Sequence, residues 1–82
     1  MWNDRLRLAE SVETQWKSLS GAEQTMVRNA LEAIDEDPIS GVPLFEPFKG
    51  LWSQRVEHLR ILYRIMPEAR FVVILFIGRA AA

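Results

Sequence analysis

Hydrophobic and polar positions alternate with a period of two at both ends of the chain and follow helical spacing in between. Near the N-terminus, Arg5-Leu6-Arg7-Leu8 alternates, which predicts a short strand with one buried face within residues 2–8. From residue 48 onward the period of two returns. Three more strands are therefore predicted, over residues 51–56, 59–66 and 70–77.

Between these strand segments, two apolar stripes have helical spacing. The first comprises Val12, Trp16 and Leu19 and predicts a helix with Ser11 as its N-cap. A second helix is predicted to start at Ser20 or Gly21, with Glu23 as the capping-box partner of Ser20. Its apolar positions are Met26, Val27, Ala30, Leu31 and Ile34. The two helices are expected to form an antiparallel hairpin whose joint apolar face covers a sheet.

The remaining connections differ in length and composition. Asp35-Glu36-Asp37 ends the second helix, because Pro38 disfavours helix at the residue before it. The stretch 38–47 holds three prolines and one glycine, and we interpret it as a loop with extended pieces. A tight turn or bulge is expected at Glu57-His58. The nearly continuous apolar run of residues 70–77 predicts a central strand that is buried on both faces.

The 82 residues fit one domain, spanning 1–82, of the α+β class. The order is an N-terminal strand, a helical hairpin and a three-stranded antiparallel meander, because consecutive strands joined by short turns usually pair. On the middle strand of this meander, one face carries Leu59, Ile61, Tyr63 and Ile65. The opposite face carries Arg60, Leu62 and Arg64.

Composition narrows the chemistry. The chain has no cysteine, which excludes disulfides, thiolate zinc sites and cysteine nucleophiles and is compatible with a reducing cytoplasm. The N-terminal residues do not have the pattern of a signal peptide. The longest apolar run, residues 71–77, is too short to span a bilayer as a helix, so no membrane association is expected. Neither a metal-binding spacing nor a glycine-rich phosphate loop is present, so we expect no metal and no cofactor.

Charge is divided unevenly along the chain. The formal net charge is −1, but residues 1–45 hold four basic and eight acidic groups (−4), and residues 46–82 hold six and three (+3). All basic residues of the second half except Lys49 are arginines, which suit bidentate contact with phosphate or carboxylate. The alternative is that these arginines only solubilise an exposed sheet face.

The arginines of the meander are expected to converge. Arg60 and Arg64 share a strand face with about 13 Å between their α-carbons. If the strand ending in Arg79 lies beside them, three guanidinium groups meet on one concave surface, bordered by Lys49 and Arg55. Such a cluster suits a polyanion backbone.

The pattern resembles the RelE/ParE superfamily of bacterial toxins. One shared feature is the element order, and another is the stretch Phe48-Lys49-Gly50-Leu51-Trp52-Ser53-Gln54-Arg55-Val56-Glu57-His58-Leu59-Arg60-Ile61-Leu62-Tyr63-Arg64-Ile65. It is similar to the family's run from an apolar-Lys-Gly segment through an Arg-Val pair to a Tyr-Arg strand. The ending Ile74-Leu75-Phe76-Ile77-Gly78-Arg79 is similar to the family's last strand.

This resemblance implies a toxin of a type II toxin–antitoxin pair that acts as a ribosome-dependent messenger-RNA endoribonuclease, neutralised by a cognate antitoxin. In that chemistry a ribose 2′-hydroxyl attacks the adjacent phosphate, and cations stabilise the transition state. By position, Arg60 and Arg79 are implied as catalytic residues. Lys49, Arg55 and Arg64 are implied as substrate-binding residues.

Two alternatives from the same superfamily stay open. A ParE-like member would bind DNA gyrase instead of cutting RNA, and a degenerate member would be kept only for antitoxin binding. The sequence stops at Ala82, before the family's C-terminal tail with its tyrosine or histidine, which favours the gyrase alternative. His58, the only histidine, is expected to be solvated. Tyr63 is interpreted as a core residue with its hydroxyl at the edge.

An antitoxin partner should leave a mark on the toxin surface. A domain of this size is not expected to bury Trp2, Trp16 and Trp52 all by itself, and an exposed aromatic of that size would mark a protein interface. Trp16 is the one most expected to fill the core.

Overall fold

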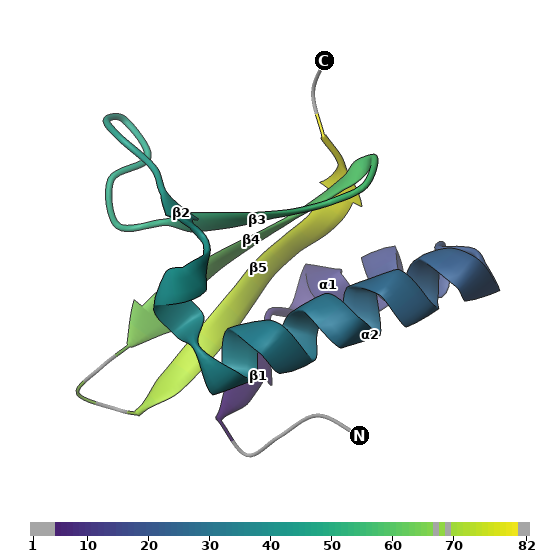
Figure 1. Ribbon diagram of the computed structural model, residues 1–82, viewed down its shortest axis with the longest axis horizontal. Coiled ribbons are helices and arrows are strands. Elements are labelled where there is room, and N and C mark those ends of the chain that lie inside the picture. Colours follow the sequence, from purple (N-terminus) through teal and green to yellow (C-terminus); the bar gives the residue numbers. More distant parts are fainter. Residues whose placement is uncertain (1–4, 67, 69, 81–82) are drawn as a thin grey trace.

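Two helices lie on one face of a five-stranded sheet in the computed structural model, which describes residues 5–66, 68 and 70–80 (Figure 1). The elements in chain order are β1 (Leu6–Leu8), α1 (Glu10–Lys17), α2 (Gly21–Glu36), the 3-10 turn η1 (Pro38–Ser40), β2 (Val42–Pro43), β3 (Trp52–Val56), β4 (Leu59–Met66) and β5 (Phe71–Arg79). The α+β class and the order of strand, helical hairpin and meander are confirmed.

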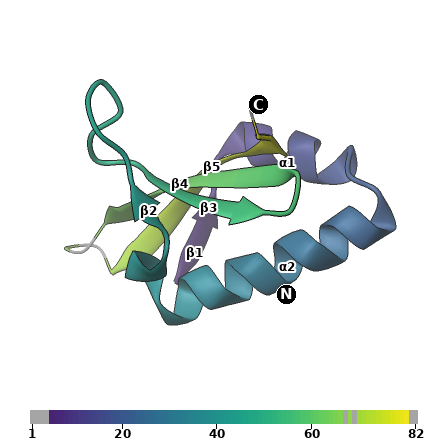
Figure 2. The same cartoon turned by 45° about the horizontal axis from the view of Figure 1, so that its top comes forward.

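The sheet has the strand order β1-β5-β4-β3-β2. The predicted meander is its centre, because β3 pairs antiparallel with β4 and β4 pairs antiparallel with β5. β1 adds parallel to β5 at one edge, and β2 adds antiparallel to β3 at the other (Figure 2). β2 comes from the stretch interpreted as a loop with extended pieces, and it holds two residues only.

The core lies between the helices and the near face of the sheet. Both stripes read from the sequence point into it, and it consists of Leu6, Val12, Val27, Leu31, Ile34, Leu59, Ile61, Tyr63, Val72, Ile74 and Ile77. Trp16 and Trp52 are half-buried and pack against this cluster. Burial of such aliphatic side chains contributes about 1.5–3 kcal/mol each and offsets the entropy of ordering a chain this short.

The two helices begin in different ways. The Ser20 hydroxyl accepts the backbone N–H of Glu23 at 3.1 Å, and a Glu23 carboxylate oxygen accepts the Ser20 N–H at 2.9 Å, so the predicted capping box is confirmed. The prediction of Ser11 as the N-cap of α1 is wrong. That helix starts at Glu10, after Ala9, whose backbone N–H donates to the Ile74 carbonyl oxygen at 2.9 Å. The sheet therefore fixes the start of α1 without a side-chain cap.

The far face of the sheet is not covered by a helix (Figures 1 and 2). The prediction that β5 is buried on both faces is therefore only half right. Val72, Ile74 and Ile77 are buried, whereas the apolar residues between them are half-buried. Between the pairs Leu62–Phe76 and Tyr63–Ile74 the register skips Leu75, and this irregularity in β5 keeps its apolar side chains in phase with the core.

Tyr63 is a core residue, as predicted. Its side chain is fully buried and stacks on Trp52, with 6.4 Å between the ring centroids. Its hydroxyl donates to the Pro38 carbonyl oxygen at 2.6 Å, which ties η1 to the sheet. Burial raises the pKa of the Tyr63 hydroxyl, the backbone around Gly41 opposes this shift, and the Asp37 carboxylate adds to it. The hydroxyl therefore stays protonated and occupied as a structural donor.

Candidate functional site

The helix-free face of the sheet carries four arginines from three strands. They are Arg7 on β1, Arg55 on β3, and Arg60 and Arg64 on β4, and together they are called the arginine face below. Strand alternation places them there, because Arg60 lies between the buried residues Leu59 and Ile61. The register pairs Arg55 with Arg60, and it pairs Val73 with both Arg7 and Arg64. Two rows of arginines thus cross the sheet.

Arg60 is the most enclosed of the predicted site residues. It is half-buried, and its Nε atom is buried without a hydrogen-bond partner among the described residues. Its partner in the register is Gly78, and a β-carbon there would collide with the tip of the Phe76 ring. The absence of a side chain at residue 78 therefore leaves room for Phe76 beside Arg60. The Arg60 guanidinium makes no hydrogen bond or ion pair with a described residue, so its positive charge is uncompensated and an anion on the uncovered face would stabilise it.

Arg55 stands directly across from Arg60. Its Nε donates to the Glu57 carbonyl oxygen at 2.7 Å, in the tight turn that was predicted at Glu57-His58. Glu57 has a φ of 55°, the left-handed conformation that such a turn requires. The turn therefore orients Arg55, and two guanidinium groups share this end of the face.

Arg64 lies at the other end, beside the loop that joins β2 to β3. An Arg64 terminal nitrogen would be 3.6 Å from a β-carbon at Gly50, whose φ of +98° favours glycine. The exposed Lys49 precedes this glycine. The structure therefore brings Arg64 and Lys49 to the same end of the sheet. This agrees with the expectation that Lys49 borders the basic surface.

Arg79 does not join these arginines. The register pairs it with Leu59, so its side chain emerges on the helix side. There it lines a cleft of about 230 Å³ with Gln15, Ser18 and Glu23. The expected convergence of Arg60, Arg64 and Arg79 on one surface is therefore wrong. The sequence placed Arg79 at the end of β5 correctly, but the register that decides its face is not visible in the sequence.

Arg7 is the member of the arginine face that was not predicted. Its guanidinium carbon lies 5.2 Å from the centroid of the Phe71 ring, in a cation–π contact, and its Nη1 donates to the Leu6 carbonyl oxygen. The alternation of Arg5-Leu6-Arg7-Leu8 already placed Arg7 opposite the core. What was missing is the parallel pairing of β1 with β5, which brings it beside the meander.

His58 faces the helices and not the arginine face. Its Nε2 lies 2.6 Å from the Glu23 Oε2, and about half of its side chain is exposed (47%). Glu23 is also the capping residue of α2, so one carboxylate joins the β3–β4 turn to the start of that helix. The hydrogen bond with His58, followed by the one from the Ser20 backbone, lowers the pKa of Glu23.

This contact predicts a pH dependence of stability. Since the folded-state pKa of Glu23 lies below the ordinary value of 4.5, folding favours the ionised form. The stabilisation is complete above pH 4.5 and is lost as the pH falls through the folded-state pKa. We expect Glu23→Gln to flatten the decline in melting temperature at acidic pH, whereas Glu13→Gln on α1 should leave it unchanged. Equal slopes for Glu23→Gln and wild type would contradict this assignment.

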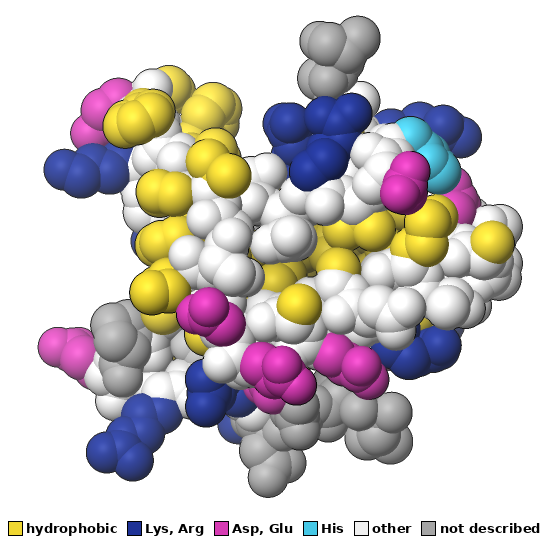
Figure 3. Space-filling view, in the orientation of Figure 1, with side chains coloured by type: hydrophobic (Ala, Val, Ile, Leu, Met, Phe, Trp, Pro, Cys, Tyr) yellow, Lys and Arg dark blue, Asp and Glu magenta, His cyan; other side chains and the backbone are white. Residues whose placement is uncertain are grey.

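Large apolar side chains are exposed in one segment of the chain. They are Ile39 (69% exposed), Val42 (63%), Phe45 (87%) and Phe48 (58%). Figure 3 shows hydrophobic side chains gathered at the left of the molecule, where β2 and the loop after it lie in Figure 1, with acidic side chains below them. The segment 39–48 is held by backbone hydrogen bonds, including Phe48 N–H to the Phe45 carbonyl at 2.8 Å. Phe45 and Phe48, not the tryptophans, are therefore the exposed aromatic residues here, and Trp2 lies outside the described residues.

The chemistry available on the arginine face is that of cations. Tyr63 lies on the opposite face and is occupied by Pro38, and His58 is bonded to Glu23. In the described ranges, no cluster of three histidine or acidic residues is arranged to hold a metal ion, and no helix is long and apolar enough to cross a membrane. The face can therefore bind phosphate groups and stabilise negative charge, but its described part holds no general base.

The sequence matches no family model and no curated protein. Its structure is similar to several solved ones. It resembles a chain of the toxin–antitoxin complex RelBE2 from Mycobacterium tuberculosis with a TM-score of 0.83 and 26% identity, over 92% of this chain and 95% of that one. It also resembles a chain of the intact RelBE complex from E. coli (TM-score 0.80, 16% identity, 94% and 96% covered). A third similar structure is the YoeB/ParE toxin from Agrobacterium tumefaciens, with a TM-score of 0.77 and 15% identity over 94% of this chain and 99% of that one.

Proposed function

We propose that this chain, which belongs to the RelE/ParE superfamily of toxins, is the toxin of a type II toxin–antitoxin pair and cuts messenger RNA on the ribosome. The observation that carries the proposal is Arg60, which holds an unpartnered buried Nε on an uncovered sheet face, directly across from Arg55. A group of this kind is suited to a phosphate.

In this mechanism the RNA backbone runs along the arginine face. A ribose 2′-hydroxyl attacks the adjacent phosphorus and gives its proton to water. The bond to the 5′-oxygen of the next nucleotide breaks, that oxygen takes a proton from water, and a 2′,3′-cyclic phosphate is left behind. Arg60 and Arg55 stabilise the extra negative charge of the transition state. Arg64 and Lys49, at the other end of the face, bind flanking phosphates. The step uses no metal and no cofactor.

The ribosome has a defined part in this proposal. Because the described face supplies cations and no general base, the largest contribution to rate must come from holding the 2′-hydroxyl in line with the phosphate. In this proposal the ribosome supplies that alignment by holding the message, and the toxin supplies the cations. The proposal places the protein in the cytoplasm and assigns Arg79, on the helix side, a secondary phosphate contact at the end of β5.

One observation favours a second candidate, the inhibition of DNA gyrase. Tyr63 and His58 are both occupied by structural partners, so neither is available to the arginine face for proton transfer. Induced expression separates the candidates. We expect growth arrest with a rapid loss of protein synthesis and intact chromosomal DNA. Growth arrest with gyrase-dependent DNA breaks would contradict RNA cleavage and indicate a gyrase inhibitor. Harmless expression would indicate a degenerate member.

An antitoxin has a suitable docking surface in the segment 39–48. Phe45 and Phe48 project from the body of the molecule, and aromatic side chains are frequent anchors at protein interfaces. We expect Phe45→Ser with Phe48→Ser to weaken the affinity for the antitoxin by more than about tenfold, which corresponds to about 1.4 kcal/mol. The melting temperature should not fall, since both rings are exposed. Unchanged affinity in a titration would remove this segment from the interface.

A further inference from the structure

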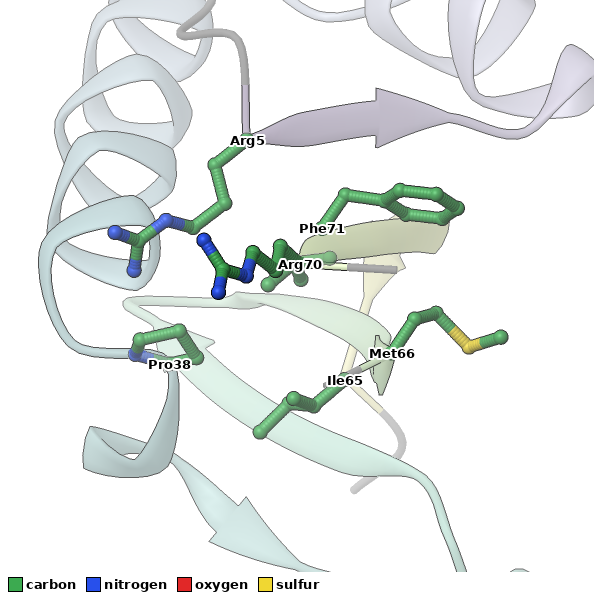
Figure 4. A pocket seen from close by; sticks show the side chains of 7 residues that line it. Arg5, Pro38, Ile65, Met66, Arg70 and Phe71 are labelled. Atoms are coloured by element: carbon green, nitrogen blue, oxygen red, sulfur yellow. The ribbon is translucent and has the colours of Figure 1, made fainter. Parts of the chain in front are cut away.

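A pocket of about 270 Å³ lies at the end of the sheet where β1 and β5 begin and β4 ends. Its lining is mostly apolar and includes Pro38, Ile65 and Val72, and two arginines, Arg5 and Arg70, stand at its rim. The Met66 and Phe71 side chains point away from the two guanidinium groups (Figure 4). Arg60 lies six residues before Met66 along β4, which is about 20 Å. The pocket is therefore separate from the Arg60 end of the arginine face.

Neither of the two arginines is in an ion pair with a described residue. Figure 4 shows both guanidinium groups directed toward the same side of the pocket. Within the described residues, neither guanidinium group takes part in a hydrogen bond or an ion pair, although the Arg5 carbonyl oxygen accepts the Val72 N–H at 2.9 Å and fixes the Arg5 backbone. Both guanidinium groups line the same pocket, so an anion placed in it would be attracted by both.

The backbone of Arg70 gives an independent indication. Its φ is 61°, in the left-handed region, at the last position before β5. Hairpin connections of this kind favour glycine or asparagine at such a position, because a β-carbon is strained there. The chain nevertheless has an arginine, and its conformation directs the guanidinium group to the pocket. Strained residues of this type cluster at binding sites.

We propose that Arg5 and Arg70 bind a carboxylate that is carried on a small apolar group. The carboxylate would contact both guanidinium groups, and the apolar group would enter the space beside Pro38, Ile65 and Val72. This volume suits one side chain or a short aliphatic acid, because whole ligands of drug size need about 300–1,000 Å³. The apolar walls favour such a ligand over an RNA phosphate, whose sugar and neighbours are polar. The proposal does not depend on RNA cleavage.

Arg70→Gly is the decisive variant. Glycine relieves the left-handed backbone, so we expect this variant to fold at least as stably as the wild type while it lacks one guanidinium group. Arg5→Ala tests the other side of the pocket. Lys17→Ala, which removes one exposed positive charge from α1, is the matched control.

The experiment is an NMR titration of the full chain with the capped peptide acetyl-Leu-Glu-Leu-amide, with its Gln counterpart, with hexanoate and with inorganic phosphate. We expect the Glu peptide or hexanoate to shift the resonances of Ile65, Arg70 and Val72. Binding should be at least tenfold weaker in Arg70→Gly and in Arg5→Ala, and unchanged in Lys17→Ala. A response to the peptide alone identifies a protein segment as the ligand, and a response to hexanoate alone identifies a free acid. Equal binding of the Gln peptide, stronger binding of phosphate, or no shift at the pocket would overturn the proposal.

Discussion

Replacement of Arg60 with alanine is expected to slow messenger-RNA cleavage about 100- to 1,000-fold, the usual loss when one preorganised donor to a developing negative charge is removed. The fold should persist. The Arg60 Nε has no hydrogen-bond partner among the described residues, so the substitution leaves no other group without its partner. The measurement is the rate of cleavage of a ribosome-bound message by purified protein.

Comparison of the arginines with one another makes this experiment specific. Arg55→Ala should show a smaller loss than Arg60→Ala, because Arg55 already donates to the Glu57 carbonyl oxygen. Arg79→Ala should show a smaller loss as well, since that side chain emerges on the helix side. If Arg79→Ala abolished cleavage and Arg60→Ala did not, the active surface would lie in the cleft near Glu23 and not on the arginine face.

Replacement of Gly41 with alanine is expected to have the largest effect on stability, about 2–4 kcal/mol of the free energy of unfolding. A methyl group at this position would collide with the Tyr63 hydroxyl and lie 2.9 Å from the Ser53 carbonyl oxygen. The collision removes the hydrogen bond from Tyr63 to Pro38, and it separates η1 from the sheet. Chemical denaturation measures the loss directly.

Gly21→Ala is the matched control for Gly41→Ala. A β-carbon at Gly21 would meet no atom within 4 Å, and the residue opens α2, where alanine is the better helix former. We expect Gly21→Ala to be neutral or stabilising by up to about 1 kcal/mol. A loss of stability at Gly41 no greater than that at Gly21 would show that the Tyr63 hydroxyl does not fix this turn.

Local sequence signals predicted the helices and the meander well. The capping box joins Ser20 and Glu23, which are three residues apart, so the sequence alone is enough to predict it. The alternation of β4 likewise fixed which side chains face the core, and it correctly assigned Tyr63 to that side. Ser11 was misassigned because the start of α1 is set by a backbone hydrogen bond from Ala9 to Ile74, which is distant in the sequence.

The candidate site was harder to predict because it depends on register. Arg60 and Arg64 were placed on one face by their spacing along a single strand. Arg79 belongs to another strand, and its face depends on a pairing with Leu59 that follows an irregularity in β5. A shift of one residue reverses every side chain of a strand, and the irregularity is not encoded by a glycine or proline. The parallel pairing that adds Arg7 is equally non-local.

The prediction that β5 is buried on both faces was wrong for the far side of this strand, which no helix of the described residues covers. The run 70–77 is apolar enough for a strand that is buried on both faces, but only its helix-facing side chains are buried. The half-buried residues on the other face lie among the arginines. An apolar run thus reports hydrophobic content and does not by itself reveal whether both faces of a strand are covered.

Cleavage of a ribosome-bound message by the purified wild-type protein tests the central claim most directly. Programmed ribosomes with an end-labelled message would be incubated with wild type or Arg60→Ala. We predict a discrete cut that requires the ribosome and is slowed about 100- to 1,000-fold in the variant. An intact message at protein concentrations above those of the ribosome would contradict the account.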